Sequence, residues 1–115
     1  MSLPSADLII YKKTEGLLDY VYPILINFPN AEKFALSQEI KQAFYALLRN
    51  IMLANNIRHK RRLYQEEVDA YLKLLLVLFN VAKKQKYITQ KKNLQIQRQL
   101  SEIGKILGGW MKSNK

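Results

Sequence analysis

Positively charged side chains give the strongest chemical signal in this sequence. The 115 residues include 19 Lys and Arg but only 9 Asp and Glu, which gives a formal net charge of +10. Acidic residues are absent from residues 40–65 and again from residues 70–101. Nine of the basic residues in these stretches form two clusters: Arg58, Lys60, Arg61 and Arg62 in the first, and Lys83, Lys84, Lys86, Lys91 and Lys92 in the second.

Cations at this density neutralise phosphates and release counterions, so they bind polyanions strongly at low salt and with little sequence preference. The charge excess predicts a nucleic acid as the first candidate partner, and an acidic membrane surface or acidic protein as the second. The alternative interpretation, for any single basic residue, is that it simply lies at a solvated helix end. Two interpretations also stay open for Tyr64 and Tyr87 near the clusters, which either stack on unpaired bases or pack as boundary residues.

The sequence gives little support for catalysis or metal binding. His59 is the only histidine, it lies within a basic run, and no cysteine accompanies it. Glu66 and Asp69 share a helix face and can hold a divalent cation weakly, but carboxylates that follow two arginines more simply form ion pairs within a helix. No phosphate-cradling glycine loop, zinc-ligand spacing or nucleotide fingerprint occurs. We therefore predict a protein that is not an enzyme and that uses no metal or cofactor.

Length and composition limit the architecture and the compartment. A chain of 115 residues that is 49% hydrophobic predicts one domain, spanning residues 1–115, around one core. The lack of cysteine excludes disulfides and fits a reducing compartment. Met1 to Ile10 lacks the charged and apolar regions of a secretory signal, and the apolar segment from Tyr71 to Ala82 is shorter than the roughly 20 residues that cross a bilayer. We expect a cytoplasmic protein that does not associate with membranes.

Apolar residues recur at helical spacing along almost the whole chain. The spacing predicts four helices, at about residues 7–27, 31–57, 61–86 and 89–112, with Asn30 and Thr89 as the N-caps of the second and fourth. Short connections make neighbouring helices antiparallel, so the expected fold is an all-α, up-down-up-down four-helix bundle with one basic cluster at each end. The predicted core includes Phe34, Ile40, Phe44, Leu47, Ile51 and Ala54 of the second helix and Ile96, Leu100, Ile103, Leu107 and Trp110 of the fourth.

The third predicted helix is more apolar than a bundle core requires. From residue 72 to residue 82, apolar side chains occupy nearly every face, whereas a helix in a monomeric bundle needs one apolar stripe. The surplus predicts a subunit interface. The alternative is a wide core-facing arc with one or two exposed leucines. The candidate interface residues are Leu74, Leu76, Leu78 and Val81.

Three segments, taken in their order and separation, resemble a known superfamily: Tyr22-Pro23, Phe28-Pro29-Asn30-Ala31-Glu32-Lys33-Phe34-Ala35-Leu36 and Glu102-Ile103-Gly104-Lys105-Ile106-Leu107-Gly108-Gly109-Trp110. This four-helix-bundle superfamily joins the ribosomal intervening-sequence proteins with Avd, the accessory variability determinant of diversity-generating retroelements. The resemblance spans nearly the whole chain. The strong basicity, the Gly108-Gly109-Trp110 ending and the absence of an acidic, glycine-containing turn after the second helix favour the Avd-like branch.

The resemblance to Avd implies a homopentamer, a barrel of five bundles. Such a protein binds the retroelement's reverse transcriptase and its template RNA, with DNA as a further candidate, and supports mutagenic, adenine-directed complementary-DNA synthesis without catalysing it. The nine clustered basic residues then become candidate contacts for nucleic acid or for the polymerase. The alternative is a structural oligomer of the intervening-sequence type, whose basic surface is incidental or binds ribosomal RNA.

Overall fold

Four long helices make up most of the computed structural model, which describes residues 5–114. They are α1 (Ala6–Ile26), α2 (Leu36–Asn56), α3 (Arg61–Lys84) and α4 (Gln90–Lys112), and the short 3-10 helices η1 (Asn30–Glu32) and η2 (Arg58–Lys60) lie in the first two connections. No strand occurs within residues 5–114, which confirms the all-α prediction. Residues 1–4, part of the segment in which we expect no secretory signal, lie outside the described residues, as does residue 115.

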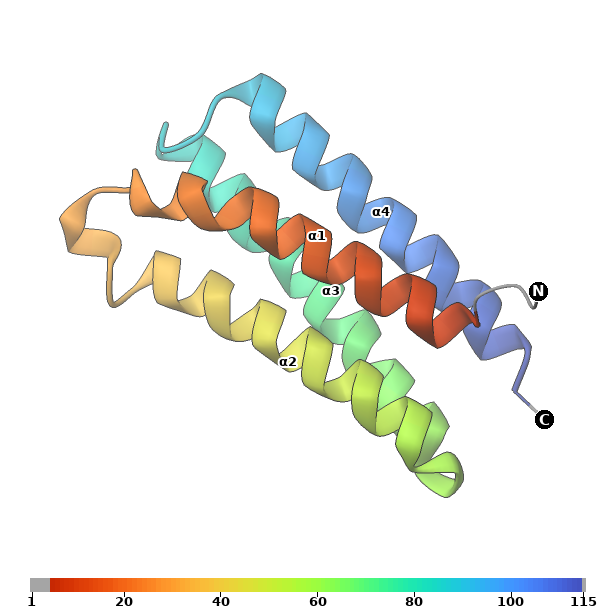
Figure 1. Ribbon diagram of the computed structural model, residues 1–115. Coiled ribbons are helices and arrows are strands. Elements are labelled where there is room, and N and C mark those ends of the chain that lie inside the picture. Colours follow the sequence, from red (N-terminus) through yellow and green to blue (C-terminus); the bar gives the residue numbers. More distant parts are fainter. Residues whose placement is uncertain (1–4, 115) are drawn as a thin grey trace.

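Neighbouring helices run antiparallel. Figure 1 shows the α1–α2 and α3–α4 connections at one end of the molecule and the α2–α3 turn at the other, together with the start of α1 and the end of α4. Each helix packs against two others, and contacts between α1 and α4 complete the bundle, which measures 45 × 25 × 21 Å. The two basic clusters therefore lie at opposite ends of its long axis.

The core is built from one apolar stripe on each helix. Side chains from all four helices join in a single cluster, in which Phe44 of α2 meets Phe79 of α3 edge to face with ring centroids 6.4 Å apart. The stripe predicted on α4 is buried throughout, and none of its members is more than 5% exposed: Ile96, Leu100, Ile103, Leu107 and Trp110.

Two predictions about the start of α2 are wrong. The sequence pattern places the helix from residue 31 with Asn30 as its N-cap, whereas Asn30 begins η1 and α2 starts at Leu36. Phe34, expected in the core, is 85% exposed. The late start of α2 explains the difference, because Phe34 lies in the turn before the helix and the buried stripe of α2 begins only at Ser37. The other three helices begin and end within two residues of the expected positions.

The helix α3 contains the longest apolar segment of the chain. No helix within residues 5–114 is long and apolar enough to span a bilayer. The core-facing side of α3 consists of buried apolar residues spaced three and four apart: Val68, Leu72, Leu75, Phe79 and Ala82. The remaining apolar residues of α3 lie on other faces, and some of them are exposed, as described below.

Candidate nucleic-acid interface

The first basic cluster lies in the α2–α3 turn, where Arg61 is bound to the end of α2. Its Nε donates to the carbonyl of Ala54 at 2.8 Å, and its Nη2 donates to the carbonyl of Asn55 at 3.1 Å. The last carbonyls of a helix lack intrahelical donors and carry a partial negative charge. The half-buried Arg61 therefore stabilises the turn, and its guanidinium is occupied by the protein's own backbone.

The other three cations of this cluster face solvent. Arg58, Lys60 and Arg62 are all exposed. The Nε of Arg62 lies 3.3 Å from Oε1 of Glu66, one turn further along α3. An exposed pair of this kind contributes little to stability, so a phosphate can replace the carboxylate at small cost. These three side chains are the members of the cluster that are free to meet a polyanion.

A hollow of about 450 Å³ opens beside this turn. Asn114 forms one wall and is held by two side-chain hydrogen bonds: it donates to Oε1 of Gln65 at 2.6 Å, and Nε2 of Gln65 donates to its Oδ1 at 3.4 Å. The residues after α4 thus complete a basic hollow of the kind that can receive a phosphate. The lining residues are Arg58, His59, Arg61, Arg62, Ser113 and Asn114.

Two of the three carboxylates of α3, Glu66 and Asp69, form ion pairs within their own helix. Oδ2 of Asp69 lies 2.7 Å from Nζ of Lys73, and Glu66 pairs with Arg62 as described above. Within residues 5–114, no group of three or more metal-ligating side chains comes together. The structure thus agrees with ion pairing as the role of Glu66 and Asp69.

The second basic cluster surrounds the α3–α4 connection at the other end of the bundle (Figure 1), and its five lysines are all exposed. The amide of Tyr87 donates to the carbonyl of Ala82 at 2.9 Å, and the amide of Lys86 donates to that of Lys83 at 3.0 Å. This pair of bonds is a Schellman motif, which needs a left-handed residue after the helix. Lys86 supplies it with φ 65°, at a position where glycine is favoured.

Replacing Lys86 with glycine should therefore stabilise the fold by about 0.5–1 kcal/mol, because a residue without Cβ adopts the left-handed conformation without strain. Thermal unfolding followed by circular dichroism measures the effect. Lys86→Ala is the matched control, since it removes the same charge and keeps the strain. A Lys86→Gly variant that unfolds at a lower temperature than Lys86→Ala contradicts this account of the turn.

Two further lysines of the cluster, Lys91 and Lys92, lie in the first turn of α4. Thr89 caps this helix, as predicted, by accepting a hydrogen bond from the amide of Lys92 at 3.1 Å. The first turn contains no acidic residue, so Lys91 and Lys92 place positive charge at the positive end of the helix dipole, where it lowers stability. Like the strained Lys86, these charges favour a binding role over a structural one. A pocket of about 350 Å³ beside them is lined by Lys83, Lys86, Tyr87, Ile88, Thr89 and Gln90.

The two tyrosines near the clusters pack against the bundle. The ring of Tyr87 lies 5.3 Å from that of Phe28, centroid to centroid, and its hydroxyl donates to Oε2 of Glu32 at 2.8 Å. This hydrogen bond, partial burial and the charge of Glu32 raise the pKa of Tyr87 above its ordinary 10.0. Tyr64 is half-buried and packs against the core. Of the two interpretations, the structure agrees with boundary packing.

A single family match covers both basic clusters, α2, α3, α4 and all of α1 except its first two residues. A family model described as bAvd-like matches residues 8–114. The chain belongs to the bAvd-like family. No curated protein and no solved structure matches this chain. Family membership confirms the resemblance to the Avd-like branch.

This bAvd-like chain also has an exposed apolar face on α3. Leu74 and Val81, two of the four candidate interface residues, are 39% and 38% exposed. Leu76 and Leu78 are half-buried and pack against the core. Val77, which the sequence reasoning missed, is 58% exposed. Residues three, four and seven apart share one side of a helix, so Leu74, Val77 and Val81 form a continuous apolar strip. The spacing of the core residues could have revealed this strip, because position 77 is out of phase with them.

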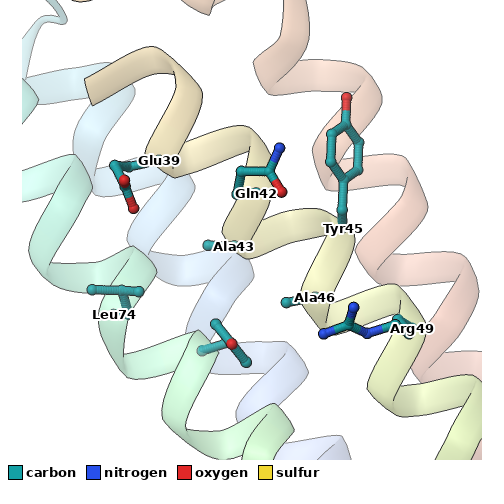
Figure 2. A pocket seen from close by; sticks show the side chains of 8 residues that line it. Glu39, Gln42, Ala43, Tyr45, Ala46, Arg49 and Leu74 are labelled. Carbon is teal, nitrogen blue, oxygen red and sulfur yellow. The ribbon is translucent and has the colours of Figure 1, made fainter. Parts of the chain in front are cut away.

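A groove of about 330 Å³ between α2 and α3 borders this strip. Figure 2 shows Glu39, Ala43, Ala46 and Arg49 along α2, with Leu74 on α3 across the groove. Ala43 and Ala46 are buried, and their small side chains leave room for the groove between the helices. Because Leu74 belongs to both features, the groove and the strip form one surface of the bAvd-like chain.

Proposed function

We propose that this chain is a non-catalytic accessory protein that binds the reverse transcriptase of a diversity-generating retroelement and its template RNA, and so supports mutagenic complementary-DNA synthesis. The observation that carries the proposal is the bAvd-like family match over residues 8–114. The net charge of +10 supports it, because a template RNA is a polyanion. The chain acts in the cytoplasm as a single domain, without metal, cofactor or membrane partner.

The exposed cations at the two ends are the proposed contacts with RNA, DNA or the polymerase. Contacts between flexible basic side chains and phosphates position a strand without reading its bases. That property suits an accessory protein whose polymerase performs the chemistry. Arg61 contributes indirectly, because it holds the turn that presents its neighbours. The eight exposed cations are Arg58, Lys60, Arg62, Lys83, Lys84, Lys86, Lys91 and Lys92.

We further propose that five chains assemble into a barrel, as the likeness to Avd implies. The exposed strip of Leu74, Val77 and Val81 supports self-association, because covering apolar side chains removes them from water. Assembly also multiplies the basic clusters, and several linked copies bind a long RNA more tightly than one copy does. The α2–α3 groove beside the strip gives the interface a concave surface into which a neighbouring chain can pack.

Co-purification tests both parts of this proposal. The chain, co-expressed with the reverse transcriptase and template RNA of its own locus, should elute with both, and light scattering of the chain alone should give five times 13.5 kDa. Val77→Asp should lower that mass because it places a charge in the apolar strip, whereas Ser101→Asp, at an exposed position of α4, should not. A 13.5 kDa species at micromolar concentration rules out the oligomer, and a pentamer that elutes apart from the polymerase rules out the accessory role.

The alternative, a structural oligomer of the intervening-sequence type, is disfavoured by the family match. Gene position separates the two functions. An accessory protein of this kind should be encoded beside a reverse transcriptase gene and paired template and variable repeats. The alternative protein should be encoded within a ribosomal RNA insertion.

A further inference from the structure

A pocket of about 250 Å³ lies between the end of α1 and the first turn of α2, and it contains none of the nine basic residues discussed above. It is smaller than the roughly 300–1,000 Å³ of sites for drug-sized ligands, so it suits one chemical group rather than a whole nucleotide. Four of its lining residues are apolar and come from the end of α1 and the residues that follow it. The lining residues are Leu25, Ile26, Phe28, Pro29, Asn30, Lys33, Ser37 and Lys41.

Ser37 is the polar residue that packing does not explain. It is 4% exposed, and its Oγ is the only buried side-chain nitrogen or oxygen within residues 5–114 that lacks a hydrogen-bond partner. An unpaired buried hydroxyl lowers stability, and each such group in a folded protein calls for an explanation. Because Ser37 lines the pocket, rotation about its Cα–Cβ bond can turn Oγ toward the cavity, where a ligand supplies the missing partner.

Two lysines bring positive charge to the same pocket. Nζ of Lys41 lies 4.8 Å from the centre of the Tyr22 ring, and Nζ of Lys33 lies 5.5 Å from that of Phe34. Cation–π contacts hold an ammonium in place without using its N–H donors. Neither lysine forms an ion pair with a carboxylate of the described chain. The pocket therefore combines two uncompensated positive charges with one unpaired hydroxyl.

The start of α2 adds hydrogen-bond donors. This helix is 21 residues long, and its N-cap, Ala35, provides no side-chain hydrogen bond. The first amides of a helix lack intrahelical acceptors, and together with the helix dipole they favour an anion. The first turn, which includes Ser37, forms one wall of the pocket. The helix end, the hydroxyl and the two ammonium groups thus favour the same class of ligand.

Several groups that would repel an anion are engaged elsewhere. At the end of α1, the carbonyls of Ile24 and Leu25 accept hydrogen bonds of 3.1 Å from the amides of residues 27 and 28. Glu32 accepts the hydroxyl of Tyr87 at 2.8 Å, and Glu39 lines the α2–α3 groove. The carboxylates nearest in sequence therefore do not line this pocket.

We propose that this pocket binds a phosphate group, as the free ion or as an ester. A phosphate dianion matches the charge of Lys33 and Lys41, and its several oxygens can accept from Ser37 and from the first amides of α2 as well. A carboxylate has half that charge and fewer acceptor atoms. The site is separate from the proposed RNA contacts, so it goes beyond the proposed function and does not depend on it.

Titration of the full-length chain with inorganic phosphate, followed by the NMR shifts of the amides of residues 36–38, tests the site. The shifts should saturate, and Ser37→Ala should weaken binding about tenfold, as loss of a hydrogen bond to a charged group does. The same variant should unfold at the wild-type temperature or above, because it removes an unpaired hydroxyl. Ser101→Ala, at an exposed position, should leave both quantities unchanged. Phosphate that moves none of these amides, or that binds Ser37→Ala as tightly as wild type, overturns the proposal.

The lysines and the source of the phosphate are tested in further arms. The Lys33→Gln, Lys41→Gln double variant should lose at least about tenfold in phosphate affinity, while Lys12→Gln, Lys105→Gln, with the same charge change, should not. Acetate that binds as tightly as phosphate overturns the assignment.

An RNA end is the source of the phosphate if a 5′-phosphorylated oligonucleotide binds more tightly than the same oligonucleotide with a 5′-hydroxyl and Ser37→Ala removes the difference. If the two oligonucleotides bind with equal affinity and inorganic phosphate saturates the site, the source is the free phosphate ion. None of these readouts involves the polymerase, so they fail independently of the proposed function.

Discussion

Replacing Lys83, Lys84 and Lys86 together with glutamine should weaken RNA binding roughly 100-fold at about 0.1 M salt, because each phosphate contact on a single strand contributes about 0.7 to the slope of log affinity against log salt. Loss of three contacts reduces the slope by about 2, which corresponds to two orders of magnitude at that salt concentration. The three side chains are exposed and form no ion pairs with carboxylates of the described residues, so folding should be unaffected. Fluorescence anisotropy of labelled template RNA across a salt series measures both affinity and slope.

The matched control replaces Lys12, Lys73 and Lys105 with glutamine, which removes the same charge from exposed positions on α1, α3 and α4. This triple variant should retain most of the affinity and nearly the full slope. Equal losses in the two variants show that net charge attracts RNA without a defined surface. Unchanged RNA affinity in the first variant shows that RNA does not contact the α3–α4 connection. Arg58, Lys60 and Arg62 are then the next side chains to replace.

Much of this fold was predictable because its determinants are local in sequence. On α4, apolar residues spaced three and four apart define one helix side, and Thr89 supplies the cap that starts the helix. Short connections then set the antiparallel topology, which alone places the two basic clusters at opposite ends. The positions of the clusters therefore followed from composition and topology without any knowledge of side-chain contacts.

Features that depend on contacts between segments distant in sequence were not predictable in the same way. Arg61 appears in the sequence as one cation among four, but its guanidinium reaches back to the carbonyls that end α2. The hydroxyl of Tyr87 donates a hydrogen bond to Glu32, which lies 55 residues earlier in the chain. The phosphate pocket likewise exists only because the end of α1 lies against the first turn of α2. Charge patterns thus located the candidate surface, whereas contacts between distant segments decide which of its side chains are free.

The exposed Val77 is a different case, because the sequence contained the signal. The buried positions of α3 follow a strict alternation of three and four residues from Gln65 to Ala82, and residue 77 falls outside it. Phe34 precedes the first residue of α2, so the helical pattern of that helix does not determine its exposure. Composition alone places a phenylalanine in the core and an isolated valine on no particular face. Helical phase decides correctly between buried and exposed positions once the core residues of each helix are fixed.

Leu107→Asp should unfold the bundle. Leu107 is 1% exposed and belongs to the cluster shared by all four helices, so an aspartate there would bury a charge without a partner. The penalty is several kcal/mol, against a total stability of about 5–15 kcal/mol for a domain of this size. Circular dichroism at 25 °C should show loss of most helical signal or a large fall in the unfolding temperature. Ser101→Asp introduces the same side chain at an exposed position of α4 and should stay close to wild type.

The pH dependence of the same variant shows whether the buried charge is the cause. Burial disfavours the ionised form, so the pKa of the introduced carboxyl group in any folded state lies above its pKa in the unfolded chain. A group with a raised pKa in the folded state stabilises it below the unfolded pKa and loses that contribution as pH rises. Leu107→Asp should therefore regain helical signal, relative to Ser101→Asp, as pH falls from 7 toward 4. If the deficit is independent of pH, the loss of leucine packing rather than the unpaired charge destabilises the fold, and Leu107→Asn should then be equally unstable at neutral pH.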